Sequence, residues 1–227
     1  MPVCLITGAN RGIGLEFVRQ YAADEWSVIA TCRKPDEAAA LQAIGGDVRL
    51  EALDVGDFAR IEALGRKLDG QPIDLLLHNA GLYGPRVMPF DRVNYAAWTE
   101  LFRINVMAPL KLSAVFVRNV AWSQRKTIVG ISSSMGSIGG NTSGGAYAYR
   151  SSKAALNAVM RSLAIDLRPK EITVAVVNPG WVRTEMGGPG ARIAPRDSVA
   201  AMRAVIDRLT PADSGRFFDY QGAEIPW

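Results

Sequence analysis

Near its amino terminus the chain passes from a short apolar run through three closely spaced glycines into a helical pattern. The run Val3–Thr7 has the composition of a strand buried on both faces, and Gly8–Gly14 follows it directly. In this setting the backbone can approach a pyrophosphate, which the amino terminus of the helix then holds. The spacing Gly-x3-Gly-x-Gly differs from the commoner Gly-x-Gly-x-x-Gly. The turn predicts a dinucleotide-binding α/β fold, with a purely structural turn as the alternative.

Further strand-like runs alternate with helical patterns along the rest of the chain. Amphipathic stretches separate apolar runs at 27–32, 48–54, 73–78, 127–131, 172–177 and 215–219. Such alternation is typical of a parallel sheet with right-handed crossovers. We therefore expect an α/β protein with a single-domain Rossmann fold, a doubly wound parallel sheet of about seven strands with helices on both faces. The 227 residues include no linker-like stretch, so one domain is expected to span 1–227.

Composition and charge argue against several classes of function. With 48% hydrophobic residues the chain can bury a sizeable core, and its net charge of +4 is dispersed along the sequence. A weak, dispersed charge gives no footprint for nucleic acid, and no apolar run approaches the length that crosses a membrane. A first strand that begins near Val3 leaves no room for a signal peptide, so a cytoplasmic location is expected.

The two cysteines and the single histidine limit the available chemistry. Cys4 and Cys32 both fall in strand-like runs, where we expect buried free thiols in a reducing compartment. Neither has a Cys-x-x-Cys or Cys/His partner at metal-ligand spacing, and no metal site is expected. His78 is the only histidine, which excludes a mechanism that needs two.

A tyrosine and a lysine stand four residues apart at the start of a helical pattern. On a helix this spacing places Tyr149 and Lys153 on one face, within reach of each other. An ammonium beside a phenol favours the phenolate, so we expect it to lower the tyrosine pKa from its usual value of about 10. The pair would then serve as a general acid/base toward an alcohol or carbonyl oxygen. A packed ring and a solvated amine are the alternative for such a pair in isolation.

The end of the second expected strand bears on the choice of cofactor. A site for NAD places an acidic residue there for the ribose 2′-hydroxyl, whereas this chain has Cys32 followed by Arg33. With Arg11 in the glycine turn, two guanidinium groups could meet a 2′-phosphate, and Lys34 could add to their field. NADP(H) is therefore favoured over NAD(H). Ordinary surface cations are the alternative.

Polar and small residues follow the third and fourth expected strands. Asp54 could accept a hydrogen bond from an adenine amino group, or merely cap the helix that begins near Asp57, and both alternatives stay open. Asn79–Gly81 follows the fourth run. Small residues at the carboxyl end of a strand let a flat cofactor lie against the backbone.

An asparagine and a serine cluster complete the candidate residues. Asn105 lies inside a long apolar periodicity from about Asp91 to Ala121, although asparagine is a poor helix former. It is either a satisfied core amide or the site of a kink that binds a water behind the lysine. The cluster Ser132–Ser134 ends the fifth run, before a glycine-rich loop and the tyrosine helix. The periodicity is built around Phe102, Val106, Leu110 and Phe116.

With these motifs in place the chain resembles the short-chain dehydrogenase/reductase family over essentially its whole length. The region Pro179–Gly188 and the ending Ile225–Trp227 look most like its carbonyl-reductase-like and C-factor-like branch. His78 replaces an asparagine that the family often has. The motifs that carry the resemblance, in the family's order, are Thr7–Gly14, Asn79–Gly81, Asn105, Ser132–Ser134 with Tyr149 and Lys153, and Pro179–Thr184.

The resemblance implies roles for the catalytic candidates. Tyr149 would be the acid/base, and Lys153 would lower its pKa and bind the nicotinamide ribose. Ser133 would hold the substrate oxygen, because the family pattern Ser-Ser-x-x-Gly ends here at Gly136. Asn105 would complete a water-linked proton relay.

The resemblance also implies a cofactor-binding set. Val182 and Thr184 would meet the nicotinamide carboxamide, and Asn79–Gly81 would flank the adenosine side. The full expected set is Gly8, Asn10, Arg11, Gly12, Ile13, Gly14, Arg33, Asp54, Val55, Asn79, Ala80, Gly81, Tyr149, Lys153, Pro179, Gly180, Val182 and Thr184.

The implied activity is an NADPH-dependent interconversion of a carbonyl and an alcohol by hydride transfer, with Tyr149 protonating the developing alkoxide. The expected substrate is a small or medium ketone, aldehyde or quinone. The alternative is a C-factor-like signalling or cofactor-sensing module with little or no turnover. A homodimer or homotetramer is expected through helices around 101–122 and 146–167. The segment Met186–Pro195 is shorter than the substrate-covering loop of many family members, which argues against a closed pocket.

Overall fold

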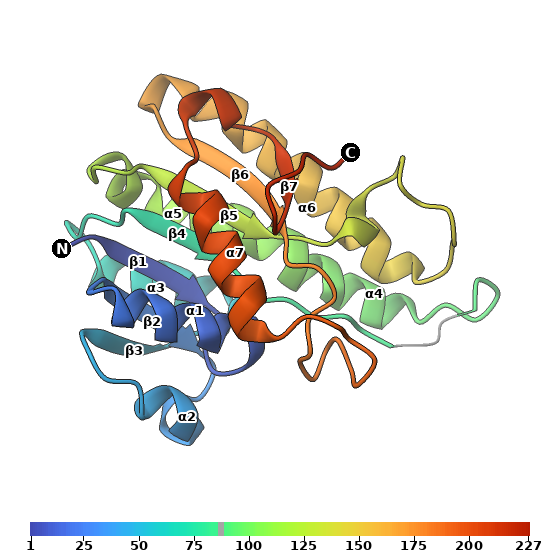
Figure 1. Ribbon diagram of the computed structural model, residues 1–227, viewed down its shortest axis with the longest axis horizontal. Helices are drawn as coiled ribbons and strands as arrows, with labels where there is room; N and C mark the ends of the chain where they lie inside the picture. Colours follow the sequence, from blue (N-terminus) through green and yellow to red (C-terminus); the bar gives the residue numbers. More distant parts are fainter. Residues whose placement is uncertain (86–88) are drawn as a thin grey trace.

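Seven parallel strands form one sheet in the computed structural model, which describes residues 1–85 and 89–227. The strands are β1 (Val3–Thr7), β2 (Ser27–Cys32), β3 (Val48–Ala52), β4 (Leu75–His78), β5 (Thr127–Ile131), β6 (Thr173–Asn178) and β7 (Phe217–Asp219). Their order is β3-β2-β1-β4-β5-β6-β7, so the chain first builds outward on one side of β1 and then on the other (Figure 1). This confirms the predicted doubly wound α/β Rossmann fold.

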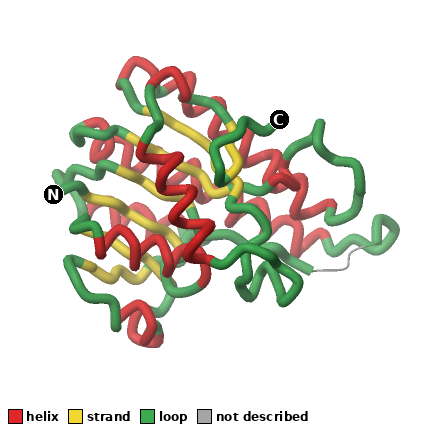
Figure 2. The backbone as a smooth tube through the Cα atoms, viewed as in Figure 1, coloured by secondary structure: helices red, strands yellow, loops and turns green. Residues whose placement is uncertain are grey.

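Helices cover both faces of the sheet, as predicted. Figure 2 shows the strands between helices and the longer loops gathered on the side where the strands end, at the right of the view. A π-helix, Arg103–Met107, joins two of the helices. The α-helices are α1 (Gly12–Ala23), α2 (Ala39–Gln42), α3 (Phe58–Lys67), α4 (Tyr95–Phe102), α5 (Ala108–Ala121), α6 (Tyr147–Asp166) and α7 (Pro195–Asp207).

Each face of the sheet has its own hydrophobic core, which explains the unbroken apolar run of β1. Leu5 packs into the core formed with α3, α5 and α6, where Phe116 is fully buried. Cys4 and Ile6 point to the opposite face, into the core formed with α1 and α7 around Phe17. Because successive strand residues face opposite sides, a strand covered on both faces must be apolar at every position.

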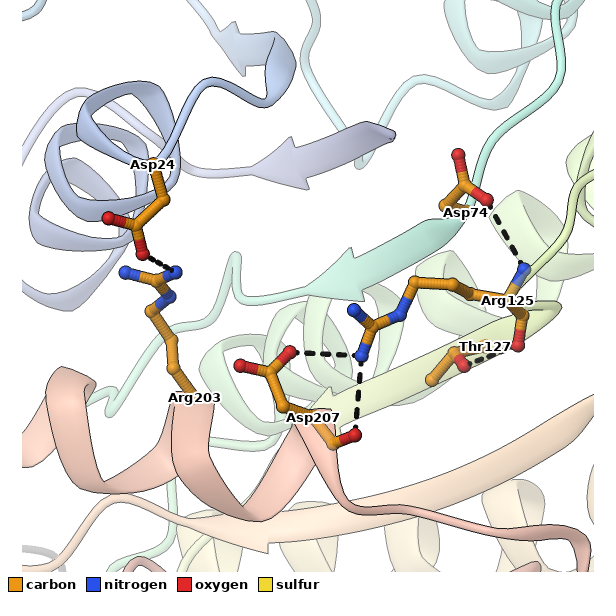
Figure 3. Close-up of polar contacts among 6 residues, drawn as sticks. All are labelled: Asp24, Asp74, Arg125, Thr127, Arg203 and Asp207. Carbon is orange, nitrogen blue, oxygen red and sulfur yellow. Dashed lines mark hydrogen bonds and ion pairs between the residues drawn. The ribbon is translucent and has the colours of Figure 1, made fainter. Parts of the chain in front are cut away.

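Polar contacts at the edge where the strands begin fasten α7 and the α5–β5 turn to the sheet (Figure 3). The carboxylate of Asp74 accepts hydrogen bonds from the backbone N–H groups of Val3 at 2.9 Å and Arg125 at 3.2 Å. The guanidinium of Arg125 in turn pairs with Asp207 at the end of α7. The contacts at the edge where the strands begin are therefore structural, and the candidate site lies at the opposite edge, where the strands end.

The long periodicity predicted between Asp91 and Ala121 is interrupted. The π-helix divides it into α4 and α5, and one extra residue in that turn rotates the face that follows. Phe116 and Val106 are buried as predicted, whereas Leu110 is 45% exposed, so its assignment to the buried face is wrong.

The structure bears on the state of the two cysteines and on the character of the helices. Cys4 and Cys32 are buried free thiols, as expected. Among the helices of the described residues, none combines the length and apolar character needed to span a membrane.

Candidate active site

The glycine turn is anchored to the end of β4 by Thr7 and Asn79. The Thr7 hydroxyl accepts hydrogen bonds from the backbone N–H groups of Asn79 at 3.0 Å and Ala80 at 3.1 Å. The Asn79 side chain donates to the carbonyls of Thr7 and Gly8. These bonds fix the turn between β1 and β4, where the sheet order reverses and ligands of open α/β sheets bind. Asn79 therefore shapes the turn, in addition to the flanking role that the resemblance implied.

Close packing excludes side chains from the turn. Gly8 has φ +66°, and a Cβ there would lie 2.9 Å from the Cα of Ala80. A Cβ on Gly14 would lie 2.2 Å from the carbonyl oxygen of Gly8. Gly12 has φ +55° and lies against Thr184, whose Cγ2 would be 3.2 Å from an added Cβ. The turn and the segment after β6 are therefore neighbours in space.

The amino terminus of α1 suits an anion. Its N-cap residue, Arg11, makes no side-chain capping hydrogen bond, and the first turn holds no acidic residue. The first N–H groups of a helix lack intrahelical partners, and the helix dipole favours negative charge there. Ile13 and Gly14 lie in this first turn, and Asn10 is exposed just before it. The donor set fits the phosphates of a dinucleotide.

The cations expected near a 2′-phosphate differ in their surroundings. Arg33 is exposed directly after β2 and makes no hydrogen bond or ion pair within the described part of the chain. Lys34 pairs with Glu37 at 2.8 Å. Arg11 pairs with Glu185, Nη1 to Oε2 at 2.7 Å. Arg11 and Arg33 are thus on neighbouring loops, but Arg11 is bonded elsewhere.

The structure answers the question left open at Asp54. The cap of α3 is Asp57, whose side chain accepts from the N–H groups of Ala59 and Arg60. Asp54 accepts from the N–H of Gly56 at 2.9 Å and so holds its own turn. Capping by Asp54 is therefore wrong, whereas its contact with adenine stays a prediction. Val55 follows it and is buried.

Tyr149 and Ser133 meet at the start of α6. The Ser133 side chain lies close enough to the Tyr149 hydroxyl to influence its pKa, and Tyr149 is 7% exposed. Burial raises the pKa of Tyr149 to about 12; Ser133 opposes this rise and Tyr83 adds to it. This is opposite to the lowering predicted from the lysine, because the ring is enclosed by protein.

The other two serines of the cluster point elsewhere. Ser132 donates to Oδ1 of Asn157 at 2.7 Å in the core beneath α6. Ser134 is exposed. A Cβ on Gly136 would lie 2.9 Å from the backbone carbon of Lys153, so this glycine lets the serine loop pack against α6. Of the cluster, Ser133 is the member brought to the tyrosine.

The amine of Lys153 lies beside the tyrosine ring and away from solvent. Its Nζ is 5.9 Å from the centroid of the Tyr149 ring and donates to the carbonyl of Ile131 at 2.9 Å. Burial lowers the pKa of Lys153 to about 8. A Cβ on Gly81 would lie 3.6 Å from this nitrogen, so the small residues after β4 face the lysine. The pair thus has the proximity predicted from its helical spacing.

Asn105 occupies the π-helix and is buried. Its Oδ1 accepts from the N–H of Leu82 at 2.8 Å, and its Nδ2 donates to the Leu82 carbonyl at 2.8 Å and to Ser152 Oγ at 3.0 Å. Ser152 also donates to the carbonyl of Tyr149 at 2.8 Å. The amide is satisfied, as the first alternative expected, and the helix departs from α geometry at Asn105; a water bound behind the lysine stays a prediction. Such π-turns are frequent at functional sites.

The segment after β6 forms a compact turn. Gly180 has φ +76° and follows Pro179, whose carbonyl accepts from Ser198 Oγ at 2.7 Å. Val182 is buried and forms a bridge with Ile193. Thr184 Oγ1 accepts from the N–H of Gly187 at 3.1 Å. Thr184 also lies against Gly12 of the glycine turn, and its contact with the nicotinamide stays a prediction.

An aromatic neighbour of the catalytic candidates was not predicted. The ring of Tyr83 lies 4.4 Å from the ring of Tyr149, centroid to centroid, at 31°. Leu101 and Ala148 are buried against the same rings, and Trp98 packs at the edge of this cluster. The sequence carried no signal for Tyr83, because its proximity to Tyr149 depends on how the residues directly after β4 pack against α6.

Known proteins with the same arrangement place the chain in a family. A family model described as short chain dehydrogenase matches residues 2–191. The C-signal protein of Myxococcus xanthus is 46% identical over 156 residues, which cover 69% of this chain and 93% of that protein.

Solved structures agree over the full length. Carbonyl reductase Sniffer of D. melanogaster is 30% identical with a TM-score of 0.93, covering 100% of this chain and 99% of that one. An NADPH-bound carbonyl reductase from chicken fatty liver is 34% identical with a TM-score of 0.89, covering 100% and 98%. The chain belongs to the short-chain dehydrogenase family, and its structure is similar to those of carbonyl reductases. This confirms the resemblance drawn from the motifs.

Proposed function

We propose that the protein is an NADPH-dependent oxidoreductase that interconverts a small or medium carbonyl compound and its alcohol. The observation that carries the proposal is the meeting of Ser133, Tyr149 and Lys153 beside the glycine turn. Similarity to a carbonyl reductase solved with NADPH supports the choice of cofactor. In this proposal the cofactor groove and the catalytic residues belong to one domain.

In this proposal the cofactor lies along the carboxyl ends of β1, β2, β4 and β6. The amino terminus of α1 would hold the phosphates, Arg33 and Arg11 a 2′-phosphate, and Thr184 with Val182 the nicotinamide end. Bound nicotinamide supplies the hydride, and the protein supplies position and electrostatics.

Tyr149 would act as the general acid in carbonyl reduction. Because burial raises the pKa of Tyr149 to about 12, the phenol is protonated at neutral pH, which is the form that can donate a proton. Ser133, which lies near the same hydroxyl, would hold the substrate oxygen within reach of that proton. Lys153 would orient the hydroxyl and stabilise the phenolate after transfer.

The experiment is a screen of ketones, aldehydes and quinones, followed by NADPH absorbance, on wild type and Tyr149→Phe. Loss of the phenolic proton is expected to lower turnover by about 10²–10⁴-fold, whereas NADPH should still bind. Tyr147→Phe is the matched control, because that ring is 43% exposed on the same turn and should keep full activity. Equal turnover in Tyr149→Phe and wild type would exclude Tyr149 as the acid.

A second candidate is a signalling or cofactor-sensing module with little turnover. The 46% identity to the C-signal of Myxococcus xanthus favours it. A module needs cofactor binding but no acid, so the intact serine, tyrosine and lysine favour the enzyme. NADPH binding by wild type without turnover of any compound in the screen would favour the module.

A further inference from the structure

An ion pair crosses from the glycine turn to the segment that follows β6. Arg11 and Glu185 are 174 residues apart in sequence, yet Nη1 and Oε2 lie 2.7 Å apart. The residues beside them, Gly12 and Thr184, are also in contact. Both side chains are largely exposed, at 63% and 77%. The pair therefore joins two walls of the proposed cofactor groove at its open side.

In this ion pair the guanidinium of Arg11 is directed toward the segment after β6. The 2′-phosphate is expected on the other side of β1, near Arg33. Glu185 follows β6, whereas Arg33 follows β2, and β1 lies between those two strands in the sheet. To join Arg33 on one phosphate, the guanidinium of Arg11 must leave Glu185 and turn toward β2. Arginine can make this turn because its side chain is long and, here, exposed.

Glu185 is presented by a folded turn. The N–H of Gly188 donates to the carbonyl of Thr184 at 2.9 Å, and the indole N–H of Trp181 donates to the carbonyl of Gly187 at 2.9 Å. These bonds hold the backbone on both sides of the carboxylate. The long, exposed side chain of Arg11 can therefore change partner without any movement of the backbone around Glu185.

We propose that Glu185 competes with the 2′-phosphate of the cofactor for Arg11, and thereby reduces the preference of the site for NADP(H) over NAD(H). The proposal rests on the proposed function, because it assumes that the groove binds a nicotinamide dinucleotide. Binding of NADP(H) requires the Arg11–Glu185 pair to break, whereas binding of NAD(H) leaves it intact. An exposed pair is weak, so the effect is a modest one of about two- to fivefold.

The test is Glu185→Gln, with dissociation constants measured by fluorescence for NADPH and NADH and by calorimetry for 2′,5′-ADP and 5′-AMP at low ionic strength. We expect about two- to fivefold tighter binding of NADPH and 2′,5′-ADP, with NADH and 5′-AMP unchanged. Glu62→Gln is the matched control, because it removes the same charge from an exposed pair with Lys111 on helices α3 and α5. That control should leave all four constants unchanged.

A double-mutant cycle separates competition from simple repulsion. In an Arg11→Met background, Glu185→Gln should change none of the four constants, because no guanidinium remains to be released. Equal tightening of all four ligands would show that Glu185 only repels phosphates, and would overturn the proposal. Unchanged NADPH affinity would overturn it and leave the cofactor site standing. If wild type bound neither dinucleotide, both proposals would fail.

Discussion

Lys153 is an amine enclosed by protein, and its burial has a cost at neutral pH. It is 5% exposed and donates to one backbone carbonyl, that of Ile131. Burial lowers the pKa of Lys153 to about 8, because a charged amine loses hydration that one hydrogen bond does not replace. An ionisable group that is buried despite this loss of hydration is typical of a functional site.

The stability of the protein should therefore rise with pH relative to a variant without this amine. The ordinary pKa of a lysine side chain is 10.5, so between about pH 8 and pH 10 the unfolded chain binds more protons at Lys153 than the folded chain. Wild type is expected to gain about 2 kcal/mol in free energy of unfolding relative to Lys153→Met over that interval. Urea unfolding of both proteins at each pH measures the difference between their free energies of unfolding. The contributions of the other titrating groups are the same in both proteins and cancel in this difference. Parallel pH curves would contradict the burial of a charged amine.

At the scale of the element, the π-helix depends on Asn105. Its amide holds both backbone polar groups of Leu82 and bonds to Ser152, which connects the π-helix to the loop after β4 and to α6. Removing it leaves buried donors and acceptors without partners.

Asn105→Ala is expected to lower the free energy of unfolding by about 2–4 kcal/mol, because several buried polar groups lose their partners at once. Asn94→Ala is the control on the same helical unit, since Asn94 is an exposed cap of α4 whose side chain accepts from the N–H of Ala97. Loss of an exposed cap should cost about 1 kcal/mol. Chemical denaturation measures both, and equal losses would argue against a special role for Asn105.

How far the elements could be predicted depends on how local their determinants are. The bounds of β1, β2 and β5 agree with the predicted runs, because unbroken apolar runs flanked by turn residues specify buried strands. The π-helix could not be predicted, because α4, the π-turn and α5 share one nearly continuous apolar pattern. The extra residue is seen in the π-helix itself and in the exposure of Leu110.

For the candidate site, too, features with local determinants could be predicted and contacts between distant residues could not. The proximity of Tyr149 and Lys153 follows from helical spacing and was predictable. The bonds between Thr7 and Asn79 join residues 72 apart, and the pair of Arg11 with Glu185 spans 174. The raised pKa of Tyr149 depends on burial, which a local motif does not specify.

At the scale of the whole molecule, the edge opposite the site is held by one buried carboxylate. Asp74 is 7% exposed and joins β1, β4 and the turn before β5 through charge-assisted hydrogen bonds. Asp74→Ala is expected to lower the free energy of unfolding by about 3 kcal/mol or more. Asp207→Ala removes the neighbouring exposed ion pair with Arg125 and should cost less than about 1 kcal/mol. Thermal or urea unfolding distinguishes the two; similar losses would contradict this assignment.

Assembly into a homodimer or homotetramer remains a prediction, and the helices expected to mediate it carry exposed apolar side chains. Leu110 of α5 is 45% exposed, Trp122 directly after α5 is 49% exposed, and Ile165 of α6 is 52% exposed. A charge placed at such a contact disfavours association. Sedimentation should therefore show an oligomer for wild type and a monomer for Leu110→Glu with unchanged circular dichroism. An oligomer that persists in the variant would place the contact elsewhere.

The order of strands in the sheet also has a consequence for how this protein matures. The candidate groups come from the segments that follow each of β1 to β6, including α6, so no short contiguous fragment holds them all. Pairings between distant parts of a chain form slowly. A nascent polypeptide would carry the glycine turn long before Thr184 emerged to lie against it, and recognition of a nucleotide would arrive as one of the last events of folding.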